Sequence, residues 1–84
     1  MKPIRLSRHA QEQCLERGAT ATEVIQAIRE GGREPAKNDR MLCRFNCPFN
    51  GLWQGKHYAI KQVAPVIKEE HNEIVVITVY TFFF

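Results

Sequence analysis

The stretch SRHAQEQCLERGATATEVIQAI, from Ser7 to Ile28, decides the fold of the N-terminal part of the chain, because it carries the boundary signals of two helices. Ser7 precedes a segment without Gly, Pro or β-branched residues, and Gly18 follows that segment. Serine is a favoured residue at the start of a helix, and glycine is favoured just past its end. A first helix is therefore predicted from Arg8 to Arg17.

The second half of the same stretch predicts another helix. Thr20 and Glu23 have the spacing of a capping box, in which each residue bonds the backbone of the other. An apolar stripe with helical spacing follows, formed by Val24, Ile25 and Ile28. We expect this helix to run from Ala21 to Glu30 and to end at Gly31. The short gap between the two helices predicts a compact helical hairpin or corner.

Beyond Pro35 the sequence favours strands. Met41 to Phe45 is short and strand-like, and Asn50-Gly51 is typical of a tight hairpin turn. His57 to Lys68 is rich in β-formers, although Pro65 is expected to break it, bulge it or place it at a sheet edge.

The last strand, Glu73 to Phe83, is apolar on both faces and is expected in the centre of the sheet. Together these segments predict one α+β domain over residues 1–84, with a helical pair at about 8–30 and a sheet at about 41–83. The expected architecture has the order ααβββ or ααββββ. Its two N-terminal helices pack on one face of a three- or four-stranded antiparallel sheet.

Composition limits the class of protein. The 84 residues are 44% hydrophobic and 25% charged, which is ordinary for a globular domain. The net charge of +3 is spread along the chain, so any polyanion-binding surface has to be assembled by folding. The N-terminus lacks the apolar stretch of a signal peptide, and the longest apolar run is far shorter than the ~20 residues of a membrane span. Three cysteines, an odd number, predict free thiols in a reducing compartment, by default the cytoplasm.

The same N-terminal stretch resembles the signature of a bacterial and phage family catalogued as domain of unknown function 4258. The shared features are His9-Ala10 opening a helix, Arg17-Gly18 closing it, and Thr22-Glu23-Val24 in a capped second helix. The segment Ile77 to Tyr80 is similar to the closing strand of that family. The family's plan resembles that of the barnase-like and RelE-like ribonuclease toxins. The resemblance thus implies metal-independent RNA cleavage or RNA binding, with a cognate inhibitor protein as a partner.

His9, Gln13 and Arg17 are spaced so that they share one side of the first helix. Cleavage of RNA without a metal needs a base, an acid and cations that stabilise the phosphorane. We expect His9 to act as general acid or base and Arg17 to clamp the phosphate, with Tyr80 orienting it or donating a proton. The alternative for each is structural: a capped-helix histidine, an arginine at the helix C-terminus, and a core tyrosine.

A binding module without catalysis is the alternative from another functional class. Aromatic residues flank the predicted hairpin, with Arg44 nearby and Lys61 on the next strand. Cations between aromatic rings can hold a nucleic-acid backbone while the rings stack bases, so Arg44, Lys61 and Trp53 are the predicted nucleic-acid contacts. The same rings could instead form a small satellite core. A third possibility is an accessory protein of a mobile element with neither activity.

The cysteines and the chain's last residues complete the candidates. Cys43 and Cys47 would lie ~13 Å apart on an extended strand, too far for one zinc ion unless the chain bends sharply at Asn46 or Pro48. No metal and no cofactor are expected. Three consecutive phenylalanines end the sequence at Phe84, too many for so small a core to bury. They predict an apolar patch that serves a homodimer through the C-terminal strand, or another partner.

Overall fold

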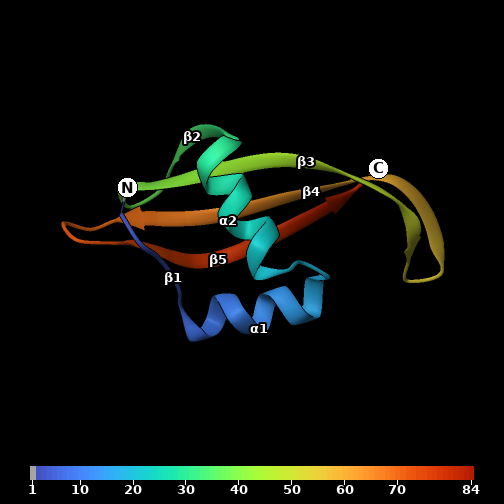
Figure 1. Cartoon of the computed structure of the whole chain (residues 1–84), viewed down its shortest axis with the longest axis horizontal. Coiled ribbons are helices and arrows are strands. Elements are labelled where there is room, and N and C mark those ends of the chain that lie inside the picture. Colours follow the sequence, from blue (N-terminus) through green and yellow to red (C-terminus); the bar gives the residue numbers. More distant parts are fainter. Residues whose placement is uncertain (1) are drawn as a thin grey trace.

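The computed structural model describes residues 2–84 and consists of one five-stranded sheet with two helices (Figure 1). The expected α+β class is confirmed. The expectation of three or four antiparallel strands is wrong, because the sheet has five strands and one of them is parallel to its neighbour. The molecule is elongated, with extents of 41 × 24 × 23 Å.

Both helices begin and end where the sequence predicts. Helix α1 spans Arg8–Arg17, and the Ser7 side chain accepts a hydrogen bond from the backbone N–H of Ala10. Gly18 ends the helix in the left-handed region, at φ +72°, which glycine adopts without strain. Helix α2 spans Ala21–Glu30 and starts with the complete capping box of Thr20 and Glu23.

The strands run in the spatial order β1-β5-β4-β3-β2. Their bounds are Ile4–Leu6 for β1, Gly32–Ala36 for β2, Arg40–Trp53 for β3, Lys56–Glu69 for β4 and Ile74–Phe83 for β5. Neither β1 nor β2 is predicted from the sequence. β1 has only three residues and exists because it pairs in parallel with the start of β5, some seventy positions away in the chain. β4, and not β5, is the central strand.

The hairpin between β3 and β4 turns four residues later than predicted. Its loop is Gln54-Gly55, where both residues have positive φ, as the tight hairpin turns of twisted strands require. Asn50 also has a positive φ, of 44°, but it does not lie in the turn. It lies where the pairing of β3 with β4 is irregular, between Pro48 and Gly51. The hairpin therefore extends beyond the end of β5 and bends out of line with the rest of the sheet (Figure 1), and its Trp53 ring lies against Gly18 at the corner between the helices.

Pro65 lies buried within the central strand, so the expected break and edge position are wrong, whereas a bulge follows it in the β4–β5 pairing between Val66 and Ile67. It pairs with Val79 of β5. On its other side the pairing of β4 with β3 joins Val63 to Phe45 and Val66 to Leu42 but skips the residues between them. The missing proline N–H is thus accommodated by a local gap in one ladder.

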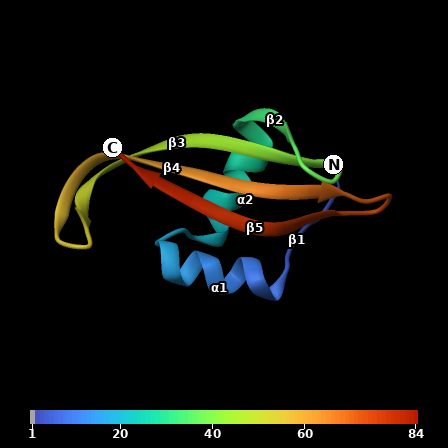
Figure 2. The same cartoon turned by 180° about the vertical axis from the view of Figure 1, so that it is seen from behind.

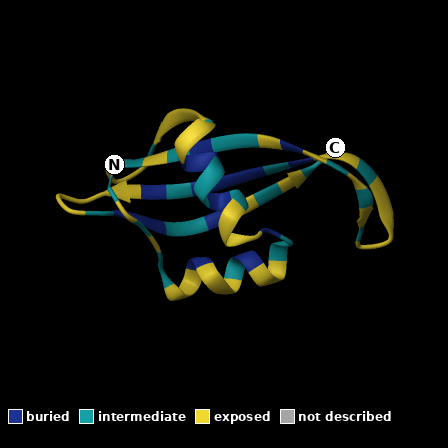
Figure 3. Cartoon of the chain, in the orientation of Figure 1, coloured by how far each residue is buried: buried dark blue, intermediate teal, exposed yellow. Residues whose placement is uncertain are grey.

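The core lies between α1, α2 and the face of the sheet that they cover (Figure 3). Its helical part is Ala10 and Cys14 of α1 with Val24, Ala27 and Ile28 of α2. Its strand part alternates along the sheet and includes Cys43, Val63, Ile67, Val76 and Val79. This alternation fixes which strand residues face away from the helices.

The opposite side of the sheet is here called the open face. Seen from behind, the strands lie in front of α2, and among residues 2–84 no helix crosses this side (Figure 2). α1 runs along the part of β5 that lies beyond its pairing with β1 (Figures 1 and 2), and side chains of α1 contact Thr78 and Val79 of β5 at the border of the open face. The residues of the open face used below are Arg44, Asn46, Ile60, Gln62, Thr78, Tyr80 and Phe82.

Candidate functional site

One border of the open face is made by polar side chains of α1 against β5. The ring Nε2 of exposed His9 lies 3.4 Å from Thr78 Oγ1. The Thr78 hydroxyl also lies 3.4 Å from Gln13 Oε1, to which it donates. The polar stripe predicted for α1 therefore meets the sheet at its edge, and His9 keeps its ring accessible to solvent.

Arg17 continues the stripe and is held at several points. Its Nη1 donates to the backbone oxygen of Val79 at 2.9 Å, and its own carbonyl accepts from Thr81 Oγ1 at 2.8 Å. Its guanidinium carbon lies 5.1 Å from the centre of the Tyr80 ring. Arg17 thus has a structural role, because it satisfies a backbone carbonyl of β5. At the same time its guanidinium lies over the aromatic ring of Tyr80.

Two exposed aromatic rings stand side by side on the open face. Tyr80 and Phe82 are 43% and 41% exposed, and their centroids lie 6.5 Å apart with an interplanar angle of 23°. The guanidinium of Arg44 lies 5.7 Å from the Phe82 ring. Each ring therefore has one arginine beside it, from α1 on one side and from β3 on the other. We call these four residues, Arg17, Tyr80, Phe82 and Arg44, the arginine–aromatic row.

Arg44 is oriented by a chain of hydrogen bonds. Its Nε and Nη2 donate to Glu34 Oε1 at 3.3 and 3.2 Å, and its Nη1 donates to Gln62 Oε1 at 3.0 Å. Gln62 Nε2 in turn donates to Asn46 Oδ1 at 2.8 Å. The ion pair with Glu34 offsets part of the Arg44 charge, and together with the bond to Gln62 it fixes the position of the guanidinium.

The three predicted catalytic residues come together only in part. Arg17 and Tyr80 are in contact. His9 precedes Arg17 by two helical turns, which is ~12 Å along the axis. It meets β5 at Thr78, two residues or ~6.6 Å before Tyr80. His9 therefore lies beside Thr78 at the border of the open face, and it does not face the contact between Arg17 and Tyr80.

Lys61 does not belong to this surface, which corrects its assignment as a nucleic-acid contact. Its side chain is only 8% exposed and points toward the helices. Nζ lies 2.8 Å from Glu23 Oε2 and donates to the backbone oxygen of Gly18 at 2.9 Å. The strand alternation explains the difference, because odd-numbered residues of β4 from 61 to 67 face the core. Lys61 ties the start of α2 to the sheet.

Trp53 also lies off the open face. It stacks on Phe83 at 5.0 Å with an interplanar angle of 13°, and Phe49 and Tyr58 pack on the same ring. A Cβ on Gly18 would lie 2.6 Å from the Trp53 ring, so the cluster sits against the corner between the helices. The alternative of a satellite core therefore describes Trp53 better than a nucleic-acid contact. Of the three final phenylalanines, Phe83 is packed here while Phe82 and Phe84 are exposed.

The three cysteines are free and buried. Burial raises the pKa of each thiol above its ordinary value, which lowers the thiolate population and the reactivity. Within residues 2–84, no three His, Cys, Asp or Glu side chains are grouped so as to hold a metal ion.

Sequence reasoning missed Gln62 and Asn46, and it placed Phe82 in an exposed apolar patch without linking it to Tyr80. Period-two alternation from Tyr80 would have placed Phe82 on the same face. Gln62 and Asn46 carry no such signal, because their pairing depends on the register between β3 and β4.

No protein-family model matches the chain, and neither the curated proteins nor the solved structures give a significant match. The family resemblance described above therefore stays a prediction. In the part of the chain that the structure describes, neither helix has the length and apolar character needed to cross a membrane.

Proposed function

We propose that the open face binds single-stranded RNA through the arginine–aromatic row. The observation that carries this proposal is the pair of exposed rings, Tyr80 and Phe82, on an uncovered sheet face with a guanidinium beside each. Proteins that bind single strands combine stacking rings with cations that follow the backbone. The net charge of +3 is compatible with a polyanionic partner.

The proposal assigns separate roles to the rings and the arginines. Arg17 lies over the Tyr80 ring and Arg44 over the Phe82 ring, and the remaining exposed surface of each ring is offered to a base. Each stacked base contributes ~1–3 kcal/mol to binding. Arg17 and Arg44 then contact phosphates or stack on the outer side of a base. Two phosphate contacts on a single strand predict a modest salt dependence, with a slope of log K against log salt of about −1.4.

The test is fluorescence anisotropy of a labelled mixed-sequence RNA of about eight nucleotides, at low salt, against the wild type and ring variants. Tyr80→Ala and Phe82→Ala are each expected to weaken binding about 5- to 150-fold. Leu15→Ala is the matched control, because Leu15 is an apolar side chain of α1 that is 87% exposed and does not belong to the open face. Equal affinity of the wild type and both ring variants, with folding verified by circular dichroism, would refute the proposal.

Strand specificity is tested in the same assay with a DNA of the same sequence and with the RNA duplex. A duplex should bind more weakly, because its bases are already stacked and cannot reach the rings. Preferential binding of the duplex would mean that only charge is recognised, and would argue against stacking.

The second candidate function is metal-independent cleavage of RNA. One observation favours it: His9 is exposed and lies at the end of a polar stripe that borders the arginine–aromatic row. An RNA held by the row would pass His9, whose imidazole could accept or donate a proton. The test is cleavage of a mixed-sequence RNA in EDTA by the wild type and by His9→Ala, with Gln13→Ala as a control from the same stripe. This function is supported if the wild type and Gln13→Ala cleave the RNA and His9→Ala does not. If the wild type does not cleave the RNA, this function is refuted.

A further inference from the structure

The two arginines of the arginine–aromatic row differ in their electrostatic partners. Arg17 donates to the neutral backbone oxygen of Val79, and no carboxylate within residues 2–84 forms an ion pair with it. Arg44 instead forms an ion pair with Glu34, whose Oε1 lies 3.2 Å from Nη2 and 3.3 Å from Nε. The charge of Arg44 is therefore partly offset before any ligand arrives, whereas that of Arg17 is not.

Strand register brings Glu34 onto the open face. Glu34 pairs with Leu42 across the β2–β3 ladder, and Leu42 precedes Arg44 by two residues, so Glu34 and Arg44 share one side of the sheet. β2 is a short edge strand, and its first four residues are all exposed. The side chain of Glu34 itself is 53% exposed. It can thus turn into solvent without disturbing the core.

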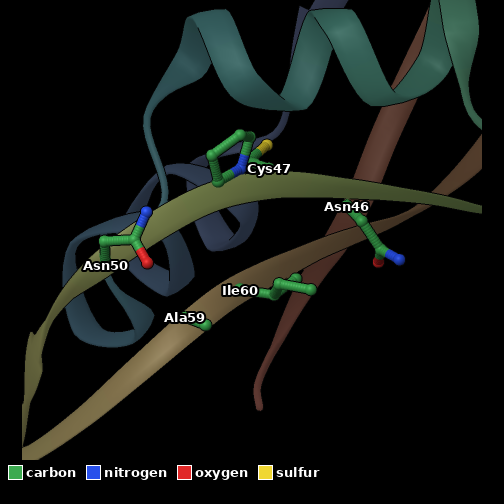
Figure 4. A pocket seen from close by; sticks show the side chains of 6 residues that line it. Asn46, Cys47, Asn50, Ala59 and Ile60 are labelled. Carbon is green, nitrogen blue, oxygen red and sulfur yellow. The ribbon is translucent and has the colours of Figure 1, made fainter.

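The other side of Arg44 offers no competing anion. Its Nη1 donates to the neutral amide of Gln62, which in turn donates to Asn46. Asn46 lies at the rim of a hollow of about 370 Å³ between β3 and β4, and the six residues that line this hollow carry no charge (Figure 4). Within residues 2–84, Glu34 is therefore the one carboxylate that pairs with Arg44.

The Glu34 carboxylate occupies the position on Arg44 that a phosphate would take. Carboxylates and phosphates make the same contacts with a guanidinium, namely charge-assisted hydrogen bonds from two N–H groups on one side of its plane. In this ion pair a single oxygen of Glu34 accepts from both Nε and Nη2. An exposed ion pair is weak, so a phosphate that is also held by neighbouring contacts can displace it.

We propose that Glu34 is a built-in competitor that a phosphate of the bound RNA displaces from Arg44; this rests on the proposed function. In the free protein the ion pair holds the guanidinium beside the Phe82 ring. On binding, the phosphate takes the Nε and Nη2 donors, and the Glu34 carboxylate turns into solvent. Each RNA that reaches Arg44 therefore loses the free energy of the ion pair. The affinity of the open face is lower than two unpaired arginines would give.

The test is an anisotropy titration of the labelled eight-nucleotide RNA at low salt. Glu34→Gln removes the charge but keeps an oxygen that can accept from Arg44, so it is expected to tighten binding about 3- to 5-fold, the range set by an exposed ion pair. Asp39→Asn is the matched control, because it makes the same change of net charge. Asp39 is exposed in the β2–β3 turn, belongs to no ion pair within residues 2–84, and lies five residues or ~16 Å before Arg44. Asp39→Asn should tighten binding much less.

A double-mutant cycle with Arg44→Gln tests whether the competition acts through the guanidinium. Arg44→Gln alone should weaken binding, because one phosphate contact is lost. Adding Glu34→Gln to this variant should then tighten binding no more than Asp39→Asn does in the wild type. A 3- to 5-fold gain that persists without Arg44 would mean that Glu34 repels the RNA directly, and it would overturn the competition.

The outcomes separate this inference from the proposed function. If Tyr80→Ala weakens RNA binding but Glu34→Gln binds no more tightly than Asp39→Asn, the competition is overturned and the RNA-binding face remains. Weaker binding by Glu34→Gln, with folding verified by circular dichroism, also overturns it, because Glu34 then only positions Arg44. If neither the wild type nor Glu34→Gln binds RNA, the proposed function and the competition fail together.

Discussion

Replacing Gly31 with alanine is expected to destabilise the protein by about 3 kcal/mol, while the same change at Gly32 should cost nothing. The backbone conformation is not the reason, since Gly31 has φ −76° and ψ 163°, which any residue adopts. The difference lies in space. A Cβ on Gly31 would lie 2.5 Å from the backbone oxygen of Ala27 and 2.5 Å from that of Arg44, whereas a Cβ on Gly32 meets nothing within 4 Å.

The magnitude follows from what would have to move. Both oxygens belong to backbone, and ordinary contact at a Cβ is 3.4–4 Å, so each must shift by most of an ångström. The Ala27 oxygen accepts the 2.9 Å bond from the Gly31 N–H that ends α2, and Arg44 is paired with Gly32 in the β2–β3 ladder. Overpacking costs typically ~1–3 kcal/mol, and two rigid contacts place this case at the upper end. At Gly32 alanine reduces the freedom of the unfolded chain, a gain of up to ~1 kcal/mol.

The assay is urea unfolding followed by circular dichroism for the wild type and both variants. With a slope near ~1 kcal/mol per molar urea for a chain of this size, Gly31→Ala should lower the midpoint by ~3 M. Gly32→Ala should leave it unchanged or raise it slightly. Free energies of unfolding that agree within ~0.5 kcal/mol for the two variants would refute the close approach of α2 to β3.

Three other changes probe the helix-facing side. Lys61→Met should lower the free energy of unfolding by about 2–3 kcal/mol, because Glu23 then keeps a poorly hydrated charge without its partner. A double-mutant cycle with Glu23→Gln measures their coupling, and a value near zero would show that the ion pair adds no net stability. Gly18→Ala should lower the free energy of unfolding by at least ~1 kcal/mol, since φ is +72° and the added Cβ meets Trp53. Trp53 is the one tryptophan of the sequence, so an unchanged fluorescence emission of the folded variant would contradict this contact. Above about pH 8.5 the free energy of unfolding should fall, because burial raises the thiol pKa values and the unfolded chain then releases protons that the folded chain keeps. Urea midpoints measured across this pH range should fall less steeply for Cys43→Ala, and an identical slope would argue against a thiol contribution.

The candidate site could be predicted from the sequence only where its residues share one element. His9, Gln13 and Arg17 lie on one helix, so their common side follows from helical spacing. Tyr80 and Phe82 lie on one strand, and alternation alone puts them together. The chain from Arg44 through Gln62 to Asn46 crosses between strands and depends on register, which no local pattern contains.

Local signals in the sequence were sufficient to determine α1, α2 and the course of β5. A serine cap, a capping box and a terminal glycine act through bonds between near neighbours, so the distant chain does not alter them. The remaining features were decided by tertiary structure. Three residues of β1 form a strand only beside β5, and Pro65 is tolerated in the centre because its missing bond falls in a gap of the ladder. Lys61 faces the core because one register aligns it with Glu23, and a register shifted by one residue would have turned it to the open face.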